Sequence, residues 1–416
     1  MPTVAYLTNQ FPSPVEPYVA EEIQELRRCG VTVIPCSARH NRAPLDSALK
    51  TFAAETLYLQ PLRLNLLIYA VFLCLVKVPM LKDFYGRALW QGSESLERRL
   101  RALLHTWLGV YYALLLEKAG VKHIHVHHGY FASWIAMVAA RFLGIEFSMT
   151  LHGSDLLLHA AYLDTKLKHC MFCVTISEFN RRHILKHHST IPRDKVVVRR
   201  MGVDPGTNKR SASQPSREGL VMLAVGRLHP VKDHAFLVRA CRLLKDQEVP
   251  FECVIAGEGP ERAFIERLIR DLDLTGQVRL LGHLSRPQLD LCYARADLVV
   301  LTSRSEGIPL VLMEAMAHGK TVLAPAINGI PELILDGKNG FLYHPGSLED
   351  FVARVALVHG SQSDFGAFGQ AAREHVLQHF NRDKNLAAFC NLLLQHVPYT
   401  HQPNREAPSY ENSLLQ

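Results

Sequence analysis

The amino-acid sequence predicts an α/β protein made of two Rossmann-like domains, each built on a parallel β-sheet. Short apolar runs alternate with helix-length stretches over residues 4–199, and the same alternation restarts at residue 220. Alternating patterns at this spacing form βαβ units, whose strands lie parallel. A length of 416 residues is enough for two domains, each with a core of its own.

The first domain is expected over residues 1–205. A helix from about Pro17 to Cys29 ends before Gly30, a residue type that often follows the last turn of a helix. A second, apolar helix is expected over Ser133–Leu143. The expected strands are Val4–Leu7, Val31–Pro35, His123–His127, Glu146–Leu151, Cys173–Ile176 and Val196–Arg199.

A polar segment rich in chain-breaking residues, 206–218, predicts a linker to the second domain, 219–380. A helix over 381–396 is expected to pack back on the first domain, and the polar segment 397–416 is expected to be disordered. The second domain is expected to contain the strands Leu220–Val225, Phe251–Ala256, Val278–Leu281, Leu298–Leu301 and Thr321–Ala324, and the helices 232–246, 260–271 and 309–318.

The apolar run Leu64–Val76 has two interpretations. It is shorter than the about 20 residues that a membrane-spanning helix needs. One interpretation is a core helix of the first domain. The other is a helix that lies in the interface of an anionic membrane, because Arg63, Lys77 and Lys82 flank the run.

The charge of the chain is concentrated in its first half. Residues 1–205 carry 24 Lys and Arg against 16 Asp and Glu, a net charge of +8, whereas residues 206–416 carry 22 against 23. This excess favours an anionic surface or an anionic acceptor. Nucleic acid is disfavoured because no basic stripe is interleaved with aromatic residues. The sequence starts without a secretory signal, and its nine cysteines follow no disulfide pattern, so a cytoplasmic protein is expected.

The stretch Ser303–Glu314 carries the most chemical information. Glu306 and Glu314 bracket a turn and the start of an apolar helix. Gly307 allows the backbone to approach a ligand closely, and Pro309 suits a first helical turn. A helix N-terminus binds phosphate and the carboxylates suit hydroxyl groups, so this arrangement fits a sugar nucleotide.

Other candidate ligand residues follow the predicted strands of the second domain, where ligands of doubly wound folds bind. Arg227 and Lys232 follow its first strand and suit a diphosphate, because both side chains are cationic. The glycine loop at Gly257 permits a tight turn, and the backbone at His283 and Leu284 is expected to contact a base.

Histidines mark the strand ends of the first domain. His152 closes one strand beside a glycine, which suits either a structural or a catalytic role. His123, His125 and His127 share one face of another strand, but no carboxylate or thiolate joins them in the sequence. The lining of an acceptor pocket, led by His127, is therefore favoured over a metal site.

The motifs of the second domain combine into one recognisable series. They are Val225-Gly-Arg-Leu with Lys232, Ala256-Gly-Glu-Gly-Pro, Leu281-Gly-His, Ser305-Glu-Gly, Glu314-Ala-Met-Ala and Asn328-Gly-Ile-Pro-Glu-Leu, all within about 220–345. This series resembles the large family 4 of retaining glycosyltransferases, which have the GT-B fold, with two Rossmann-like domains facing a central cleft. Residues 4–25 and 123–204 resemble the bacterial exopolysaccharide subgroup, including colanic-acid-type transferases.

The resemblance implies a role for each matching residue. Arg227 and Lys232 would hold the donor diphosphate, Glu306 the donor sugar and Glu314 the ribose, while His152 would act near the anomeric carbon. The implied catalytic residues are His152, Arg227, Lys232 and Glu306. The implied donor-binding residues are Gly226, Gly257, His283, Leu284, Gly307, Ile308, Pro309, Leu310 and Glu314. The implied acceptor-side residues are Asn9, Glu16, His127, Ser154 and Asp155.

Two segments depart from the pattern of the resemblance. The loop Pro14-Val-Glu-Pro17 stands where the subgroup commonly has a Ser-Glu-Thr-type run, which bears on the acceptor side. Asn328 stands where a glycine is commoner, which is a milder change.

The expected activity is the transfer of a hexosyl group from a nucleotide diphosphate sugar to a saccharide or a polyprenyl-diphosphate-linked saccharide, with retention of configuration. No aspartate-rich metal motif is evident, so no metal or other cofactor is expected. An anionic membrane surface is an expected partner, on the inner face of the cell membrane. Two other functions fit the same motifs: isomerisation of a sugar nucleotide, and binding of one without catalysis.

Overall fold

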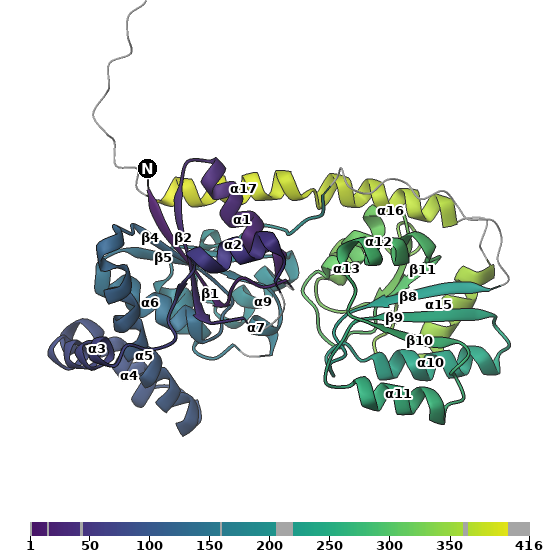
Figure 1. Cartoon of the computed structure of the whole chain (residues 1–416), viewed down its shortest axis with the longest axis horizontal. Coiled ribbons are helices and arrows are strands. Elements are labelled where there is room, and N and C mark those ends of the chain that lie inside the picture. The colour runs from purple at the N-terminus through teal and green to yellow at the C-terminus, as the bar shows by residue number, and fades with distance from the viewer. Residues whose placement is uncertain are drawn as a thin grey trace, which may run out of the picture.

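The computed structural model describes residues 2–14, 16–41, 45–158, 160–204, 219–360 and 365–397. The predicted linker, 206–218, and the predicted tail beyond residue 397 lie outside these ranges. Figure 1 shows two α/β bodies side by side, with the helices α16 (Phe365–His379) and α17 (Arg382–His396) running along one edge of both.

The first body is built on a seven-stranded parallel sheet of order β3-β2-β1-β4-β5-β6-β7. Its strands are β1 (Thr3–Gln10), β2 (Thr32–Arg39), β3 (Leu57–Tyr58), β4 (His123–His127), β5 (Glu146–Leu151), β6 (Cys173–Thr175) and β7 (Val196–Val198). Its helices are α1 (Pro17–Arg28), α2 (Ser47–Glu55), α3 (Leu64–Val76), α4 (Val78–Leu89), α5 (Leu96–Leu116), α6 (Phe131–Leu143), α7 (Ser154–Leu157), α8 (Leu163–His169) and α9 (Glu178–His187), with short 3₁₀ turns at Glu117–Ala119 and Arg193–Lys195.

The second body has a six-stranded parallel sheet of order β10-β9-β8-β11-β12-β13. Its strands are β8 (Leu220–Val225), β9 (Phe251–Ala256), β10 (Val278–Gly282), β11 (Leu298–Val300), β12 (Thr321–Pro325) and β13 (Phe341–Tyr343). Its helices are α10 (His234–Asp246), α11 (Arg262–Asp271), α12 (Arg286–Arg295), α13 (Leu310–Ala317), α14 (Ile330–Leu333) and α15 (Leu348–Gly360). The predicted fold class, two parallel-sheet Rossmann-like domains, is confirmed.

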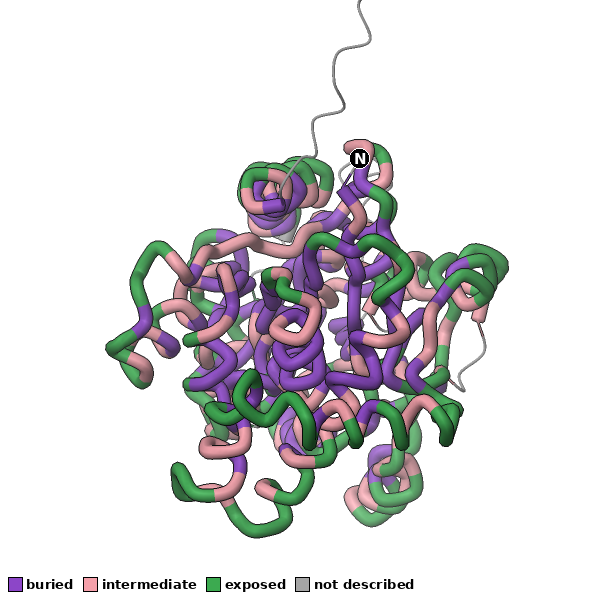
Figure 2. The backbone as a smooth tube through the Cα atoms, turned by 90° about the vertical axis from the view of Figure 1, so that its left-hand side faces the viewer, coloured by how far each residue is buried: buried purple, intermediate pink, exposed green. Residues whose placement is uncertain are grey.

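The strand order determines where ligands can bind. In each sheet the order reverses once, between β1 and β4 and between β8 and β11. Connections on the two sides of such a point run over opposite faces of the sheet, which leaves a crevice at the carboxyl ends of the strands. The loops after β1, β4, β8 and β11 are therefore the ones that can line a site. The sheets themselves are buried, as the purple interior of Figure 2 indicates.

The helix α3 is not a core helix, so that interpretation of the run Leu64–Val76 is wrong. Only Ala70 and Cys74 are buried, while Leu64 is 69% exposed and Phe72 56% exposed. Along the described residues, no unbroken helix is long and apolar enough to cross a membrane. The pair α3 and α4 meets the length and composition criteria together, with a bend of 92° between them.

The helix α17 packs on the first domain. Phe389, Cys390 and Leu393 are buried in a cluster with Ile23 and Phe172, and the Phe389 ring lies 5.2 Å from that of His125. The start of the helix is held by Arg382, which pairs with Glu21 at 3.2 Å and Asp204 at 3.0 Å. The carboxyl-terminal helix thus completes a core whose other members come from the amino-terminal domain.

Truncation of Phe389 should destabilise the first domain. We expect Phe389→Ala to lower the free energy of unfolding by about 3–5 kcal/mol, because a 3%-exposed ring is replaced by a cavity. Urea denaturation followed by circular dichroism measures this loss. Asn391→Ala, on the exposed side of the same helix, is the control. Equal effects of the two changes would contradict the packing described here.

Candidate active site

The loops after β8 and β11 bring a cation and a carboxylate together. Lys232 Nζ lies 2.5 Å from Glu306 Oε1, and the Ser303 hydroxyl donates to the same oxygen at 2.6 Å. Arg227 is exposed on the same side, and among the described residues it has no ion-pair partner. The adjacency of β8 and β11 thus unites three predicted site residues, and leaves Arg227 available to an anion.

The Glu306–Gly307 turn meets the first domain directly. Gly307 lies against the His152 carbonyl oxygen so closely that any side chain at position 307 would collide with it. Gly153 packs tightly against the same turn, since an added Cβ would lie 3.1 Å from the Gly307 nitrogen. Asn328 donates to the Glu306 carbonyl oxygen at 3.1 Å, with a left-handed φ of 47° that asparagine tolerates. The Glu306–Gly307 turn therefore contacts the backbone of His152 and Gly153 across the domain boundary.

Glu314 is held by two residues that the sequence analysis missed. Its carboxylate pairs with Arg286 and accepts a hydrogen bond from the Tyr293 hydroxyl at 3.0 Å. Both partners come from α12, which lies beside α13 and has no motif of its own. The carboxylate is partly exposed although the rest of α13 is largely buried, so its position allows contact with a ligand.

The remaining predicted donor residues line the ends of β8, β9, β10 and α13. Gly257 has φ of 152°, and a side chain there would collide with the Gly226 carbonyl oxygen. His283 is exposed and Leu284 half-buried. Ile308 and Pro309 are buried, Leu310 is half-buried, and Pro309 is the N-cap rather than the first helical residue of α13.

A chain of hydrogen bonds runs from a buried carboxylate to His152. The Glu22 carboxylate on α1 lies 2.9 Å from His127 Nε2, and His127 Nδ1 lies 2.9 Å from His152 Nε2. The Tyr6 hydroxyl also donates to Glu22. The statement that no carboxylate joins these histidines is therefore wrong, because α1 supplies one from 105 residues away. His127 is fully buried, so it is not exposed to a pocket as the acceptor-side prediction expected, and it contacts His152.

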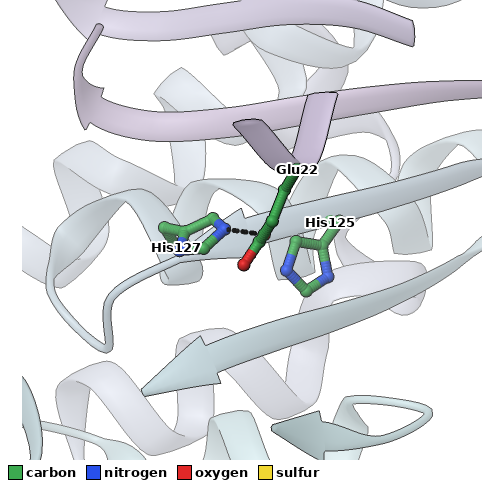
Figure 3. Close-up of side chains that lie close together, drawn as sticks. All are labelled: Glu22, His125 and His127. Carbon is green, nitrogen blue, oxygen red and sulfur yellow. Dashed lines mark hydrogen bonds and ion pairs between the residues drawn. The ribbon is translucent and has the colours of Figure 1, made fainter. Parts of the chain in front are cut away.

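Figure 3 shows the Glu22 carboxylate between the rings of His125 and His127. Their ligand-type atoms lie within 4.8 Å of one another, as in a metal site. The two ring nitrogens of His125, however, bond to the hydroxyls of Ser148 at 2.8 Å and Thr150 at 3.1 Å. Both ring nitrogens of His127 are also engaged. Because no nitrogen is left to converge on a common point, the group fits a hydrogen-bond network better than a metal site.

This network leaves one ring nitrogen of His152 without a partner. His152 Nε2 lies 2.9 Å from His127 Nδ1, whereas His152 Nδ1 has no hydrogen-bond partner among the described residues. Burial, together with the charge of His128, lowers the pKa of His152 well below its usual value. His152 is therefore uncharged at neutral pH.

Asp155 organises the loop that carries His152. It is fully buried and accepts from the backbone nitrogens of Gly129 at 2.9 Å, His152 at 3.1 Å and Gly153 at 2.8 Å. Burial alone would raise its pKa, but hydrogen bonds and the charge of His128 hold that pKa well below the usual range. The acceptor-side prediction for Asp155 therefore needs correction: it positions the loop and is not open to a substrate.

The other acceptor-side residues lie at the mouth of the first domain. Glu16 pairs with His128 at 3.1 Å, and its pKa is lowered in part by the charge of Arg227 from the second domain. Ser154 is exposed and its hydroxyl lies 2.7 Å from that of Tyr130. Asn9, at the end of β1, is half-buried.

A second contact between the domains was also missed. The Glu332 carboxylate accepts from the backbone nitrogens of Glu178 at 3.0 Å and Phe179 at 2.6 Å, at the N-terminus of α9. Arg200 donates to it at 3.2 Å. A carboxylate at this end of a helix is stabilised by the free N–H groups and the helix dipole. Glu332 of the second domain thus caps α9 of the first domain. This contact helps to fix the position of one domain relative to the other.

The His128 charge should make stability depend on pH. Burial lowers the pKa of His128, but the nearby carboxylates of Asp155 and Glu16 outweigh burial and raise that pKa to about 10. The stabilisation is complete below the unfolded-state pKa of about 6.5 and is lost as pH rises toward 10. We expect the free energy of unfolding to fall by a few kcal/mol over this window.

His128→Asn is the matched variant, because His128 has φ of 71° and asparagine accepts this conformation. Urea denaturation between pH 6 and 10 should give a flatter profile for His128→Asn than for the native chain. Identical slopes would mean that His128 carries no proton in the folded state at neutral pH.

Comparison with known sequences agrees with this geometry. Residues 207–375 match the family model described as glycosyl transferases group 1. A segment of 197 residues is 33% identical to the amylovoran biosynthesis glycosyltransferase AmsK of Erwinia amylovora and covers 46% of this chain and 48% of that protein. A putative colanic acid biosynthesis glycosyltransferase, WcaL of Salmonella typhimurium, is 35% identical over 46% of this chain and 49% of its own length. The matched region thus spans about half the length of these relatives.

Solved structures resemble the whole chain. A glycosyltransferase from Rickettsia africae superposes with a TM-score of 0.68 at 19% identity, covering 95% of this chain and 98% of that one. Anabaena Alr3699/HepE, solved in complex with UDP, gives 0.68 at 18% identity and covers 95% and 100%. At these identities the likeness shows the fold alone, which is the GT-B architecture. The match of residues 207–375 to the model of the group 1 glycosyltransferases agrees with the glycosyltransferase resemblance of the motifs in the second domain.

Proposed function

We propose that the protein is a retaining glycosyltransferase that moves a hexosyl group from a nucleotide diphosphate sugar to a saccharide or lipid-linked saccharide. The observation that carries this proposal is the contact of the Glu306–Gly307 turn with His152 across the domain boundary. It brings the turn that carries Glu306, which pairs with Lys232, against the backbone of the segment that carries the uncharged His152, while Arg227 has no ion-pair partner among the described residues. A sugar diphosphate needs these groups: cations for its phosphates and acceptors for its hydroxyls.

The proposed chemistry follows from these positions. The acceptor oxygen bonds to the anomeric carbon, and the bond from that carbon to the phosphate oxygen breaks with both electrons left on the nucleoside diphosphate. The acceptor proton passes to that phosphate oxygen. Arg227 and Lys232 stabilise the charge that develops there, together with the N-terminus of α13. With these charges in place, no metal ion is required in the proposal.

His152 orients the donor sugar in this scheme. Its Nδ1 has no hydrogen-bond partner among the described residues and can form a hydrogen bond with a sugar hydroxyl. Glu306 binds another hydroxyl of the sugar, and Glu314 the hydroxyls of the ribose. Arg286 and Tyr293 hold the Glu314 carboxylate in place before the ligand binds, which reduces the entropy that binding must overcome.

The biological setting is part of the proposal. Two relatives are named for exopolysaccharide biosynthesis, which supports the same role here, with acceptors on a polyprenyl diphosphate. The exposed apolar side chains of α3 and the charge of +8 over residues 1–205 support peripheral binding on the inner face of a cell membrane. Flotation with anionic liposomes measures this, and an absence of binding at low salt would rule it out.

A panel of nucleotide sugars tests the proposed activity. With no acceptor present, a glycosyltransferase releases free nucleotide slowly, an isomerase returns a new nucleotide sugar, and a binding protein does neither. Turnover should survive EDTA. If EDTA abolished it and Mg²⁺ or Mn²⁺ restored it, the metal-independent mechanism would be wrong.

If Arg227 and Lys232 stabilise the leaving diphosphate, removal of either side chain should greatly reduce turnover. We expect Arg227→Ala or Lys232→Ala to reduce turnover on the order of 10²–10³-fold, the scale of one preorganised charge-stabilising group. Arg227→Lys should rescue only in part, because lysine cannot make the bidentate contact. Steady-state kinetics measures this. Arg239→Ala, an exposed arginine on α10, is the control, and near-native turnover in both site variants would refute the role.

Binding measurements can distinguish the roles proposed for Glu306 and Glu314. Glu314→Gln should weaken the nucleotide and the nucleotide sugar alike, by roughly 1.5–3 kcal/mol, because it contacts the ribose. Glu306→Gln should weaken the nucleotide sugar more than the nucleotide. Calorimetric titration with both ligands measures the difference, and equal losses for both ligands in both variants would reject this assignment.

A further inference from the structure

A second cavity lies in the first domain, away from the proposed donor site. It has a volume of about 550 Å³ and lies between the start of α5, the turn before α6 and the start of α8. We call it the α5 cavity. Its lining residues are Arg39, Arg98, Arg101, Ala102, Leu104, His105, Gly129, Tyr130, Phe131, Trp134, Ala161, Tyr162 and Lys166. None of them is acidic, so its chemistry differs from that of the Glu306 site.

The α5 cavity concentrates positive charge. Within the described part of the chain, no acidic side chain pairs with Arg39 or Arg98, whereas Arg101 pairs with Glu97 on the exposed side of α5. Arg39 lies 5.2 Å from the centre of the Phe131 ring, which holds its guanidinium at the wall. Unpaired cations grouped around a hollow repel one another, and a bound anion would relieve this repulsion.

Two titratable side chains in the wall of the α5 cavity, Lys166 and His105, have lowered pKa values. Lys166 is buried, and its Nζ donates to the carbonyl oxygens of Gly129 at 2.6 Å, Tyr130 at 3.0 Å and Ala161 at 2.8 Å. Burial lowers its pKa to about 7. Burial and the charges of Lys166, Arg101 and Arg39 lower the pKa of His105 to about 4. The wall of the cavity is therefore an environment in which additional positive charge is unfavourable and negative charge is favourable.

The backbone at the start of α6 also favours an anion in the α5 cavity. The helix α6 begins at Phe131 in the cavity wall, with Tyr130 as an N-cap whose side chain does not cap the helix. Free N–H groups and the dipole at a helix start favour anions, and this effect coincides here with the unpaired arginines.

An apolar path leads out of the cavity. Leu96, Leu100 and Leu104 are spaced by four residues on one face of α5, and they are 72%, 55% and 46% exposed. Leu104 itself lines the cavity. An anion site that opens onto an exposed apolar stripe suits a ligand with a charged head and an apolar chain.

The α5 cavity shares a wall with the His152 loop. Gly129 lines the cavity, and its nitrogen donates to Asp155, which also accepts from His152. The Tyr130 hydroxyl lies 2.7 Å from that of Ser154. A head group in the cavity would therefore lie beside the loop that presents His152 to the second domain.

We propose that the α5 cavity binds the phosphate or diphosphate group of an acceptor carried on an apolar chain, with the chain along Leu96, Leu100 and Leu104. The inference rests on the proposed function, in which the acceptor is lipid-linked. Arg39 and Arg98 contact the phosphates, and the saccharide extends past Tyr130 and Ser154 toward His152.

Calorimetric titration of the full chain with geranyl diphosphate, inorganic diphosphate and geraniol tests this assignment. Geranyl diphosphate should bind more tightly than inorganic diphosphate, and geraniol should not bind measurably. Arg39→Gln and Arg98→Gln should each weaken both diphosphates about tenfold, which corresponds to about 1.4 kcal/mol. Leu100→Ser should weaken geranyl diphosphate several-fold and leave inorganic diphosphate unchanged. These substitutions are on exposed side chains, so the variants should fold.

Two controls separate this site from the donor site and from general charge effects. Arg28→Gln, an exposed arginine on α1, removes the same charge elsewhere and should leave binding unchanged. Lys232→Ala should leave geranyl diphosphate binding unchanged. Loss of binding in Lys232→Ala, equal losses in Arg28→Gln and Arg98→Gln, or no binding of any diphosphate would each overturn the proposal. Arg98-dependent binding without turnover of any nucleotide sugar would refute the proposed function and leave the phosphate site in place.

Discussion

Asp155 is a carboxylate with no exposed surface, and the arrangement of the first domain around the cleft depends on it. It accepts from the backbone nitrogens of Gly129, His152 and Gly153, and it lies 3.8 Å from His128 Nδ1. An unpaired buried carboxylate is costly, so this set of partners is what allows the charge to stay inside the domain. Through these partners one side chain fixes the wall of the α5 cavity, the His152 backbone and the glycine that contacts the second domain.

The second domain uses its charges differently. Lys232 and Glu306 pair with one another, whereas Arg227 is exposed and has no ion-pair partner within the described chain. A ligand with a diphosphate and hydroxyl groups can take both partners of the ion pair, Lys232 through phosphate and Glu306 through hydroxyls. The ion pair therefore keeps the two side chains ordered before binding without blocking either, which limits the rotamer entropy lost when a ligand binds.

The sequence predicted the fold and the donor half of the candidate site because both follow from short-range rules. Strand and helix patterns determine parallel sheets, and the ends of neighbouring parallel strands meet at one edge, so Arg227, Lys232 and Glu306 could be grouped from position alone. Glu22 could not, because its meeting with His127 depends on how α1 rotates against the sheet. The sequence shows Glu22 only as one polar residue of an amphipathic helix, although it is buried.

The exposure of α3 follows from what surrounds it rather than from its own composition. An apolar run of 13 residues suits a core or an interface equally well, and the choice depends on whether another element covers it. Here α3 packs on α5 through Leu66, Leu67 and Leu73, and its other face is left open. The same helix α5 carries the exposed leucines and two of the three arginines of the α5 cavity, Arg98 and Arg101. Because one rigid element presents both features, an acceptor bound there would, in the proposed function, approach His152 from the apolar side of the first domain, while the donor diphosphate would meet Arg227 in the second. The two substrates would then enter from opposite domains and meet only where Gly307 contacts the His152 carbonyl, which explains why both domains place small residues at that point.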